Sequence, residues 1–471
     1  MADVSQETFA LSPEQPGNWL DDGYERLFQL SWRDYQDVQL AVLKRRFEEL
    51  STSVAALEKL VKREGVTSVN SFEDALPLLF DHRVYKSYPL SLIEKRDFPK
   101  LTGWLNRLTT HDLGAMDLAG LTTIEEWLDR LDAFGMLIGH STGTTGKLSF
   151  LPRSGTERRS WQMAYQEASR AATGIDSRSD TVETFFPGYR GGHHMMLKML
   201  WLFDVPAAGG PEHFHTLYPT HVPADLSSLA GRMQSAEDRG ELAKLGLDPA
   251  LLKAREEMIA QAKRRDQDVE AWFFKLFEQF RGKRVKIGGT FSDLIRTARS
   301  GIEKGLKPEF APGSFISTGG GMKGFKDAPE DWEGYIKDYF GIEKLGMVYG
   351  MSEGMPNHPR CSQKNFHILP QTIPFLFDRD MKLLPREGVQ TGRLAIFDLL
   401  AETYWGGFIS GDQVTIDWEE NCGCGWKGPT VGPVISRFAE MEGGDDKISC
   451  AGTAQAYNDF MDFVSQGLAP S

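Results

Sequence analysis

Three short apolar segments, separated from one another by helical stretches, constrain the fold of this chain more than any other feature. They read "VKIGGT" at 285–290, "SFISTGGG" at 314–321 and "KLGMVYG" at 344–350. Short strands that alternate with helices are typical of α/β layers with parallel strands. From about residue 365, "TIPFLFDRD", "TGRLAIFDLL" and "GGFISGDQVTIDW" instead resemble strands joined by turns. The sequence therefore predicts an α/β fold with layered α/β subdomains and a β-rich subdomain.

The rest of the chain divides into a leader, a main unit and a short end piece. Residues 1–20 form a polar leader that is expected to be poorly ordered. The main unit is expected over 21–437, with a helical N-terminal part to about 135, a charged helical insert near 225–284 and the β-rich part near 365–437. In the helical part, "LTTIEEWLDRLDAFGM" predicts a helix with Thr122 or Thr123 as N-cap and Glu126 closing a capping box. Residues 438–471 form a short C-terminal remnant.

Composition excludes several classes of protein. The chain has 471 residues, 25% of them charged, and a net charge of −13. An acidic surface argues against nonspecific nucleic-acid binding, which needs a basic face. The N-terminus shows no basic region followed by an apolar core, and no apolar run approaches the roughly 20 residues of a membrane span. We expect a cytoplasmic protein without membrane insertion.

The stretch "GHSTGTTGKLSF" at 139–150 has the composition of a phosphate-binding loop. It is not the P-loop of nucleotide hydrolases, because that pattern places a hydroxyl residue after the lysine, where this chain has Leu148. Glycines allow a tight turn and close approach to a ligand, and consecutive N–H groups form an anion nest. The candidate residues are Ser141, Thr142, Gly143, Thr144, Thr145, Gly146 and Lys147. The alternative is an ordinary flexible turn.

Two further segments place polar groups after a strand. In "VYGMSEG", Tyr349 is suited to stacking on a base, Ser352 to donating to a phosphate, and Glu353 to holding Mg²⁺. In "FISGDQVTID", Asp412 follows Gly411 and has the chemistry to accept from both ribose hydroxyls. Each segment alone is equally typical of a plain turn.

Taken in order, "STGTTGK", "YGMSE" and "SGD" resemble the adenylate-forming superfamily, which includes acyl-CoA synthetases, luciferases and nonribosomal peptide adenylation domains. The resemblance covers roughly residues 70–450. It implies activation of a carboxylate with ATP and Mg²⁺ to an acyl-AMP and pyrophosphate. The catalytic residues that it implies are Glu353, Ser352 and Lys147. Besides the loop residues, the nucleotide-binding residues that it implies are Gly319, Gly320, Tyr349, Gly350, Asp412 and, in "VISRF", Arg437.

Within the superfamily, "TGTTGKLS", "GGGMKG" and "DDKISCAGTAQAY" are similar to the subgroup of phenylacetate–CoA ligases and the acyl-protein synthetases of bacterial luminescence. "FFPGYRGGHHMM" lies where those ligases carry an aromatic, glycine-rich segment beside the acyl pocket. The pocket residues that this implies are Phe186, Tyr189, His193 and Gly321. The alternative for each aromatic or histidine is a packed core residue.

Three of the four cysteines have metal-ligand spacing. Five residues separate Cys361 from His367, after the "YGMSE" segment, and Cys422 and Cys424 form C-x-C in "NCGCGWKG". Three thiolates and an imidazole complete a closed tetrahedral shell, which suits structural zinc, and the family resemblance also implies zinc. The alternative is three buried free thiols. A zinc ion here would fasten the "YGMSE" loop to the subdomain of Asp412.

The chain departs from the family at its end. Full-length synthetases have a mobile C-terminal domain that supplies a catalytic lysine, and only about 25 residues follow Lys447 here. That domain is therefore expected to be largely missing. Lys147 and Lys323 are the motif-associated substitutes, and Cys450 is either an acyl acceptor or a packed apolar residue.

The sequence predicts a carboxylate-adenylating, AMP-forming acid–thiol ligase, with an aryl acid as first substrate class and a fatty acid as competitor. The thiol is CoA or a cysteine, namely Cys450 or that of an acyl-acceptor protein. Two further hypotheses stay open: transfer of the acyl group to an amine, and a non-catalytic relative that binds nucleotide. Catalysis is expected to come mainly from positioning and charge neutralisation.

Overall fold

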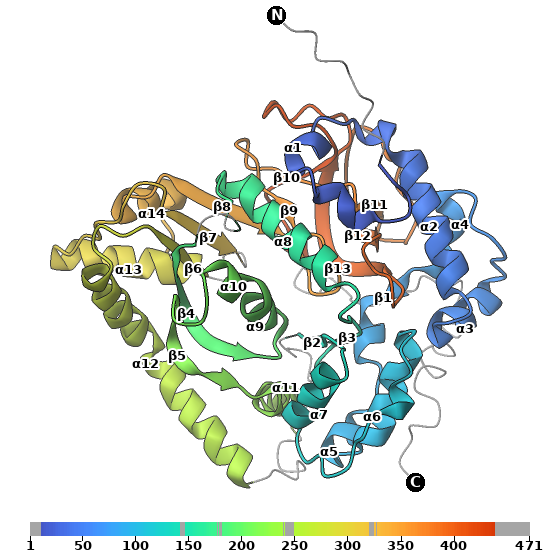
Figure 1. Cartoon of the computed structure of the whole chain (residues 1–471), viewed down its shortest axis with the longest axis horizontal. Helices are drawn as coiled ribbons and strands as arrows, with labels where there is room; N and C mark the ends of the chain where they lie inside the picture. The colour runs from blue at the N-terminus through green and yellow to red at the C-terminus, as the bar shows by residue number, and fades with distance from the viewer. Residues whose placement is uncertain are drawn as a thin grey trace, which may run out of the picture.

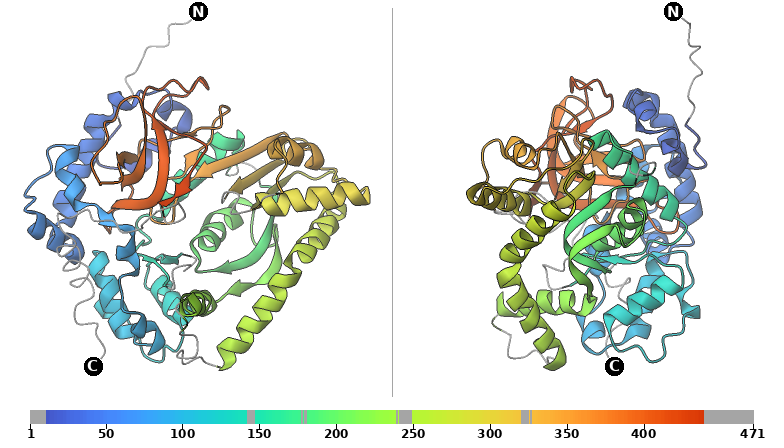
Figure 2. Two further views of the ribbon diagram at one scale, coloured as in Figure 1. Left: turned by 180° about the vertical axis from the view of Figure 1, so that it is seen from behind. Right: turned by 60° about the vertical axis from the view of Figure 1, so that its left-hand side comes forward.

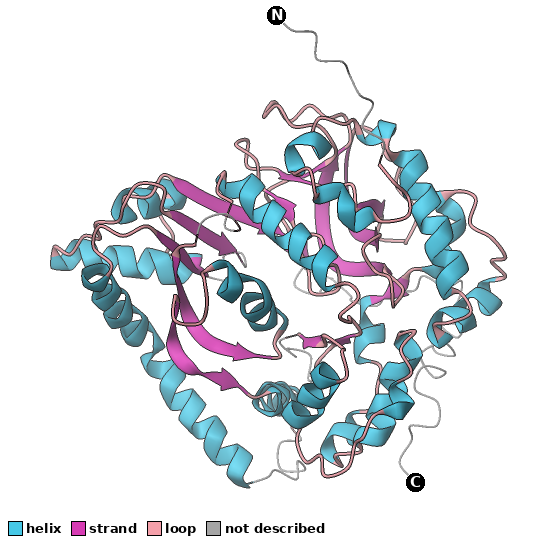
Figure 3. Ribbon diagram, viewed as in Figure 1, coloured by secondary structure: helices cyan, strands magenta, loops and turns pink. Residues whose placement is uncertain are grey.

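The structure is a computed structural model that describes residues 11–141, 147–176, 178, 181–238, 240, 249–319, 325 and 327–438. Its helices are α1 Tyr24–Leu27, α2 Gln36–Leu50, α3 Ala55–Glu64, α4 Phe72–Ala75, α5 Leu90–Glu94, α6 Phe98–Leu105, α7 Ile124–Ala133, α8 Arg158–Thr173, α9 Met195–Met199, α10 Val205–Ala207, α11 Ala224–Asp238, α12 Pro249–Gln279, α13 Phe291–Lys304 and α14 Trp332–Phe340. Helix and strand content is mixed throughout, so the predicted α/β class is confirmed (Figure 3).

The strands form two large sheets and one short hairpin. They are β1 Phe80–Asp81, β2 Gly139–His140, β3 Phe150–Leu151, β4 Glu183–Gly192, β5 Phe214–Val222, β6 Val285–Thr290, β7 Phe315–Gly319, β8 Lys344–Tyr349, β9 His358–Pro359, β10 Phe366–His367, β11 Thr372–Phe377, β12 Val389–Asp398, β13 Gly407–Asp417, β14 Thr430–Val431 and β15 Ser436–Arg437. One sheet has the order β5-β4-β6-β7-β8-β9, and the other runs β10-β14-β13-β12-β11 with β1 and β15 on β13.

The first sheet is the predicted parallel one. Strands β5, β4, β6, β7 and β8 pair in parallel, and only β9 is antiparallel. Helices α12, α13 and α14 lie along it (Figure 1). The second half of α12 belongs to its core, since Phe273 and Phe277 are buried against β6 and α14 residues. The second half of the predicted helical insert is therefore part of the core. Helices α11 and α12 together connect β5 to β6, two strands of the same parallel sheet.

The second sheet is the predicted β-rich subdomain, and it is largely antiparallel. Every residue of β11 is buried, and helices α2, α3 and α4 cover the sheet on the outside (Figures 1 and 2). The N-terminal helices therefore pack on strands that come more than 300 residues later. For example, Gln39 Nε2 on α2 donates to the carbonyl of Pro370 at 2.7 Å.

Helix ends follow the sequence signals. The predicted capping box at α7 is confirmed with Thr123 as N-cap, whose hydroxyl accepts from the Glu126 N–H at 3.1 Å. The predicted leader is wrong over its last residues, because Trp19 and Leu20 are 3% and 0% exposed. Two large apolar side chains at this position pack under α8 rather than remain in solvent. None of the helices in the described ranges is long and apolar enough to cross a bilayer.

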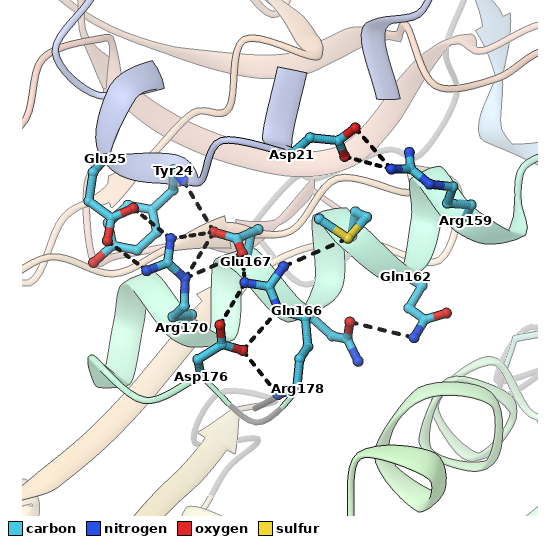
Figure 4. A network of polar contacts seen from close by, with 11 residues as sticks. Asp21, Tyr24, Glu25, Arg159, Gln162, Gln166, Glu167, Arg170, Asp176 and Arg178 are labelled. Atoms are coloured by element: carbon cyan, nitrogen blue, oxygen red, sulfur yellow. Dashed lines mark hydrogen bonds and ion pairs between the residues drawn. The ribbon is translucent and has the colours of Figure 1, made fainter. Parts of the chain in front are cut away.

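Helix α8 lies between the two sheets and binds the N-terminal segment through a charged network (Figures 1 and 4). Glu167, which is fully buried, accepts from the Tyr24 N–H at 3.1 Å and from Arg170 at 2.8 Å. Arg170 in turn makes a bidentate pair with Glu25. The helix is therefore fixed from the side opposite to β8.

A second buried carboxylate fixes the start of α8. The Oε2 atom of Glu157 accepts from the N–H and the hydroxyl of Ser154 at 3.0 and 2.7 Å. Its Oε1 accepts from the N–H groups of Glu402 and Thr403 at 3.2 and 2.7 Å, and from the Thr403 hydroxyl at 2.5 Å. This side chain joins the segment before α8 to the loop after β12.

We expect Glu157→Gln to lower the free energy of unfolding by about 2–4 kcal/mol, because an amide nitrogen would replace one of two buried oxygens that only accept hydrogen bonds. Urea unfolding measures the loss, and Glu48→Gln on the exposed side of α2 is the control. A loss for Glu157→Gln no larger than that of the control would contradict the role of this contact.

Candidate active site

Several predicted residues meet at the carboxyl edge of the parallel sheet. Strand β7 ends at Gly319 and its neighbour β8 ends at Tyr349, with Thr318 paired to Met347. Ligands in α/β sheets bind beyond this edge of the strands. Gly320 and Gly321, which directly follow, lie outside the described residues.

The candidate phosphate-binding segment at 141–147, called the Gly/Thr loop below, begins and ends at the same edge of the sheet. Strands β2 and β3 pair on either side of it, and the Ser149 N–H donates to Ser141 Oγ at 3.0 Å. The His140 N–H donates to the carbonyl of His193, directly after β4, at 2.9 Å. The loop therefore starts beside the end of the predicted pocket segment. Thr142, Gly143, Thr144, Thr145 and Gly146 lie outside the described residues.

Tyr349 and Asp412 connect the two large sheets. The Tyr349 hydroxyl donates to Asp412 Oδ2 at 2.9 Å, and Asp412 Oδ1 lies 2.9 Å from Arg437 Nε. Asp412 pairs with Arg437 in the β13–β15 register, so the sheet itself holds this ion pair. Burial, followed by the charge of Asp412, raises the pKa of Tyr349 well above its ordinary value. The phenol therefore stays protonated and orients the carboxylate.

The Tyr349 ring is placed differently from the stacking role that the sequence suggests. It is 6% exposed, and its ring centroid lies 6.1 Å from that of His358 and 5.9 Å from that of Phe366. The Arg437 side chain, by contrast, is 59% exposed. In this group of three residues, Arg437 is therefore the one exposed to solvent and covers Asp412, while Tyr349 is buried behind the carboxylate.

Ser352 and Glu353 follow in a turn whose backbone is held from two sides. The Ser352 carbonyl accepts from Arg153 Nη2 at 2.6 Å. The Met355 N–H donates to Asp398 Oδ2 at 2.8 Å. The Glu353 side chain is partly buried and makes no hydrogen bond or ion pair with any residue in the part of the chain that the structure describes. A carboxylate without a partner is a suitable Mg²⁺ ligand.

Asp398 supports this turn and adds a pH dependence. Burial raises its pKa to about 6, although the Met355 and Leu400 N–H groups oppose the shift. A folded-state pKa above the unfolded value of 3.8 means that the folded chain holds a proton there that the unfolded chain has released. Its stabilising effect is therefore complete below about pH 4 and is lost as the pH rises through 6.

We expect the stability advantage of the wild type over Asp398→Asn to shrink by about 1–3 kcal/mol between pH 4 and pH 7, because the variant has no group to titrate. Urea unfolding of both proteins at the two pH values gives the difference. An advantage that grows with pH would contradict the assignment.

The predicted pocket residues do not form one wall. Phe186 on β4 stacks on Phe214, with centroids 6.5 Å apart, and packs with Val205 near α10. Tyr189 instead donates to Gln261 Oε1 on α12 at 2.6 Å, on the other face of the sheet. The two residues are three positions apart on β4, and side chains at an odd separation along a strand face opposite sides.

His193 faces α7 in a charged cluster. Its Nε2 lies 2.9 Å from Asp129 Oδ1, and its Nδ1 lies 3.2 Å from the Nζ of Lys198. Lys198 also pairs with Asp132 and donates to the Ile138 carbonyl. Glu125, Asp129 and His193 lie close enough for a metal ion. However, a lysine that donates to Nδ1 leaves the proton on Nε2, where a metal would have to bind.

Of the two predicted site lysines and the terminal cysteine, the structure describes only Lys147. The Lys147 Nζ donates to the carbonyl of Tyr88 at 2.7 Å, and burial lowers its pKa. It is thus directed toward the N-terminal helical part. Lys323 and Cys450 lie outside the described residues, as does the rest of the chain after Phe438.

The four predicted zinc ligands come together from two hairpins. Cys361, His367, Cys422 and Cys424 have ligand atoms that all lie within 4.8 Å of one another. The Sγ atoms of Cys361 and Cys422 are 3.4 Å apart, and Cys424 Sγ lies 3.2 Å from His367 Nε2. The His367 Nδ1 lies 3.0 Å from the Lys427 carbonyl. A histidine that donates from Nδ1 presents Nε2 to a metal, so the residues fit zinc.

The cluster of three cysteines and His367 is adjacent to the Tyr349 group. A single bridge between Arg360 and Phe366 joins β9 and β10 into a short hairpin. Cys361 follows this bridge, His367 ends β10, and Phe366 packs on Tyr349. The Phe28 ring covers His367, and the Phe28 carbonyl accepts from the Lys427 N–H. The cluster therefore joins the N-terminal segment, the β8 end and the second sheet.

Arg153, Glu157 and Asp398 are buried charged residues near the site that the sequence did not indicate. Each is a charged residue that bonds at least one backbone group far away in the chain, so neither spacing nor a motif marks it. The one available signal was the position of Arg153 and Glu157 shortly after the Gly/Thr loop.

Comparison with solved structures returns ligases. The chain is similar to 2-hydroxyisobutyryl-CoA ligase with 2-HIB-AMP and CoA (14% identity, 89% of this chain and 78% of that chain, TM-score 0.48) and to the same ligase in the postadenylation state (12%, 92% and 73%, 0.49). It is also similar to the anthranilate CoA ligase AuaEII with anthranoyl-AMP (11%, 64% and 50%, 0.32). No protein-family model and no curated protein matches the sequence. These solved proteins are CoA ligases. At these TM-scores the similarity does not assign a function to this chain.

Proposed function

We propose that this chain belongs to the adenylate-forming superfamily and activates a carboxylic acid with ATP and Mg²⁺. The observation that carries the proposal is the meeting of three separate motifs. Three features lie around one edge of the parallel sheet: the two ends of the Gly/Thr loop, the ends of β7 and β8, and the Asp412–Arg437 pair.

The nucleotide is held by groups of different kinds. Backbone N–H groups and hydroxyls of the loop at 141–147 bind the phosphates. Asp412 accepts from the ribose hydroxyls when Arg437, which covers it in this structure, moves aside. Tyr349 contributes by orienting Asp412, and Arg437 lies where it can pair with ribose or phosphate. Glu353 holds Mg²⁺, which neutralises phosphate charge when it is bound.

The reaction has two steps. A carboxylate oxygen of the acid attacks the α-phosphorus, the bond between the α- and β-phosphates breaks, and pyrophosphate leaves. A thiolate then attacks the carbonyl carbon of the acyl-AMP, and AMP leaves. CoA is the proposed acceptor, with Cys450 or a partner's cysteine as the alternative.

An aryl acid is the proposed substrate class, and a fatty acid is the alternative. The proposal rests on the aromatic segment before His193. Since Phe186 and Tyr189 face opposite sides of β4, a single acyl pocket contains one of them. Phe186 is the better choice because the Tyr189 hydroxyl is already bonded to α12.

Carboxylate-dependent exchange of labelled pyrophosphate into ATP tests the adenylation step without an acceptor. A panel of aryl and fatty acids, with a reaction lacking acid as control, names the substrate class. Exchange with at least one acid is the expected result. If no acid supports exchange, the proposal of adenylation by this chain is wrong. Addition of CoA to wild type and Cys450→Ser then separates the two acceptors.

A further inference from the structure

We propose that Arg153 is the positioning residue of the turn that carries Glu353. This inference rests on the proposed function. Arg153 follows β3, the strand that closes the Gly/Thr loop, and its own carbonyl accepts from the Leu137 N–H at 2.7 Å. Its backbone is therefore part of the loop's base, while its side chain extends toward the turn after β8.

The guanidinium contacts four separate segments. Its Nη2 donates to the Ser352 carbonyl at 2.6 Å, and its Nη1 to Met195 Sδ at 3.0 Å. The Nε lies 3.5 Å from the Tyr404 hydroxyl, and the group stacks on Trp161 at 4.5 Å from the ring centroid. These contacts join the loop base, α8, α9 and the loop after β12 to the Glu353 turn.

The charge of this side chain is directed to a backbone carbonyl. Arg153 is 1% exposed, so it cannot touch a ligand, and among the residues that the structure describes no carboxylate lies within ion-pair distance of it. Burial of a cation is costly unless strong hydrogen bonds compensate it. The charge-assisted hydrogen bond from Arg153 to the Ser352 carbonyl is such a compensating bond, and bonds of this kind are about twice as strong as neutral ones.

The bond acts on Glu353 through the planar peptide group. The carbonyl of Ser352 and the N–H of Glu353 belong to one peptide plane, so fixing the carbonyl oxygen fixes the direction in which the Glu353 backbone continues. Small errors in the placement of a charge-neutralising group reduce rates strongly. A lysine cannot take over, because it has no planar fork to contact the carbonyl, the sulfur and the indole ring together.

Two measurements on the full chain test the proposal. The first is the affinity for ATP by calorimetry, with and without Mg²⁺, which reports the metal-dependent gain in affinity. The second is the exchange kinetics. For Arg153→Lys, we expect the metal-dependent gain to fall about tenfold, metal-free ATP affinity to stay within about twofold, and kcat to drop about 10–100-fold with KM for the acid unchanged.

Glu157→Gln is the matched control, since it weakens the adjacent buried contacts with Ser154 and Thr403 without touching Ser352. It is expected to lose stability and keep the full metal-dependent gain. Met195→Leu removes one acceptor of the guanidinium at nearly constant volume, and it is expected to shift the gain in the same direction by a smaller factor. If Arg153→Lys does not fold, the metal-dependent gain of Met195→Leu tests the positioning role instead.

The outcomes separate the inference from the function. A wild type that neither binds ATP nor exchanges pyrophosphate overturns the proposed function. A wild type that does both, with a metal-dependent gain unchanged in Arg153→Lys or, failing that, in Met195→Leu, overturns the positioning role alone. An equal loss of the gain in Glu157→Gln also overturns it, because general loosening of the fold then explains the effect.

Discussion

Glu353→Gln is expected to reduce carboxylate-dependent pyrophosphate exchange by about 10²–10³-fold while leaving the melting temperature unchanged. The carboxylate is partly buried and lies near Tyr349 and Tyr85. Burial is the main cause that raises the pKa of both phenols, and the charge of Glu353 adds to it. Removing a charge that has no partner among the described residues costs the fold little. It removes the proposed magnesium ligand, so the loss should appear in kcat.

Glu343→Gln is the matched control for this experiment. Glu343 lies just before the same strand, β8, but its side chain is exposed at the opposite end from the site. We expect its exchange rate to equal that of the wild type. Glu353→Gln with more than about a third of wild-type activity would show that this carboxylate does not carry the metal.

The second large effect concerns zinc. We expect the purified chain to contain about one zinc ion, and Cys424→Ser to contain almost none and to melt on the order of 10 °C lower. Zinc would join hairpin β9–β10 to the turn at 422–424, and this hairpin packs on Tyr349. Loss of the metal is therefore expected to lower exchange activity as well, through displacement of Tyr349 and Asp412.

Elemental analysis and thermal unfolding measure the two parts of this prediction. Cys450→Ser is the control for zinc content, because it removes a thiol outside the cluster and should leave the metal in place. A wild type without bound metal, or a Cys424→Ser protein with wild-type zinc content, would contradict the zinc assignment.

The sequence predicted the strands well where periodicity and length agree. The segments at 285–290 and 344–349 are the strands β6 and β8, because each is a short run bounded by glycine or a turn. The segment at 407–417 is the strand β13, in whose second half apolar and polar residues alternate. The helix cap was predicted as Thr122 or Thr123 because its signal is entirely local, and the structure has Thr123 there. The zinc ligands also have local spacing, and the structure brings all four together.

Long-range polar contacts could not be predicted in this way. Arg153 meets the carbonyl of Ser352, and Glu157 meets two backbone N–H groups near Thr403. A backbone group carries no residue-type signal, so no pattern in the sequence identifies the partner. The core position of the second half of α12 was missed for a different reason: its charged residues obscure the aromatic ones that face the sheet.

The packing of the N-terminal helices on the last strands has a consequence for the order of folding during synthesis. Trp32 Nε1 donates to the carbonyl of Trp418, 386 residues later, and β1 pairs with β13. Contacts of such sequence separation form slowly, because a long loop must close first. The N-terminal helices therefore emerge from the ribosome well before the sheet that buries them exists. Their apolar faces stay exposed until β13 is made, and exposed apolar surface of this kind makes a nascent chain prone to aggregation.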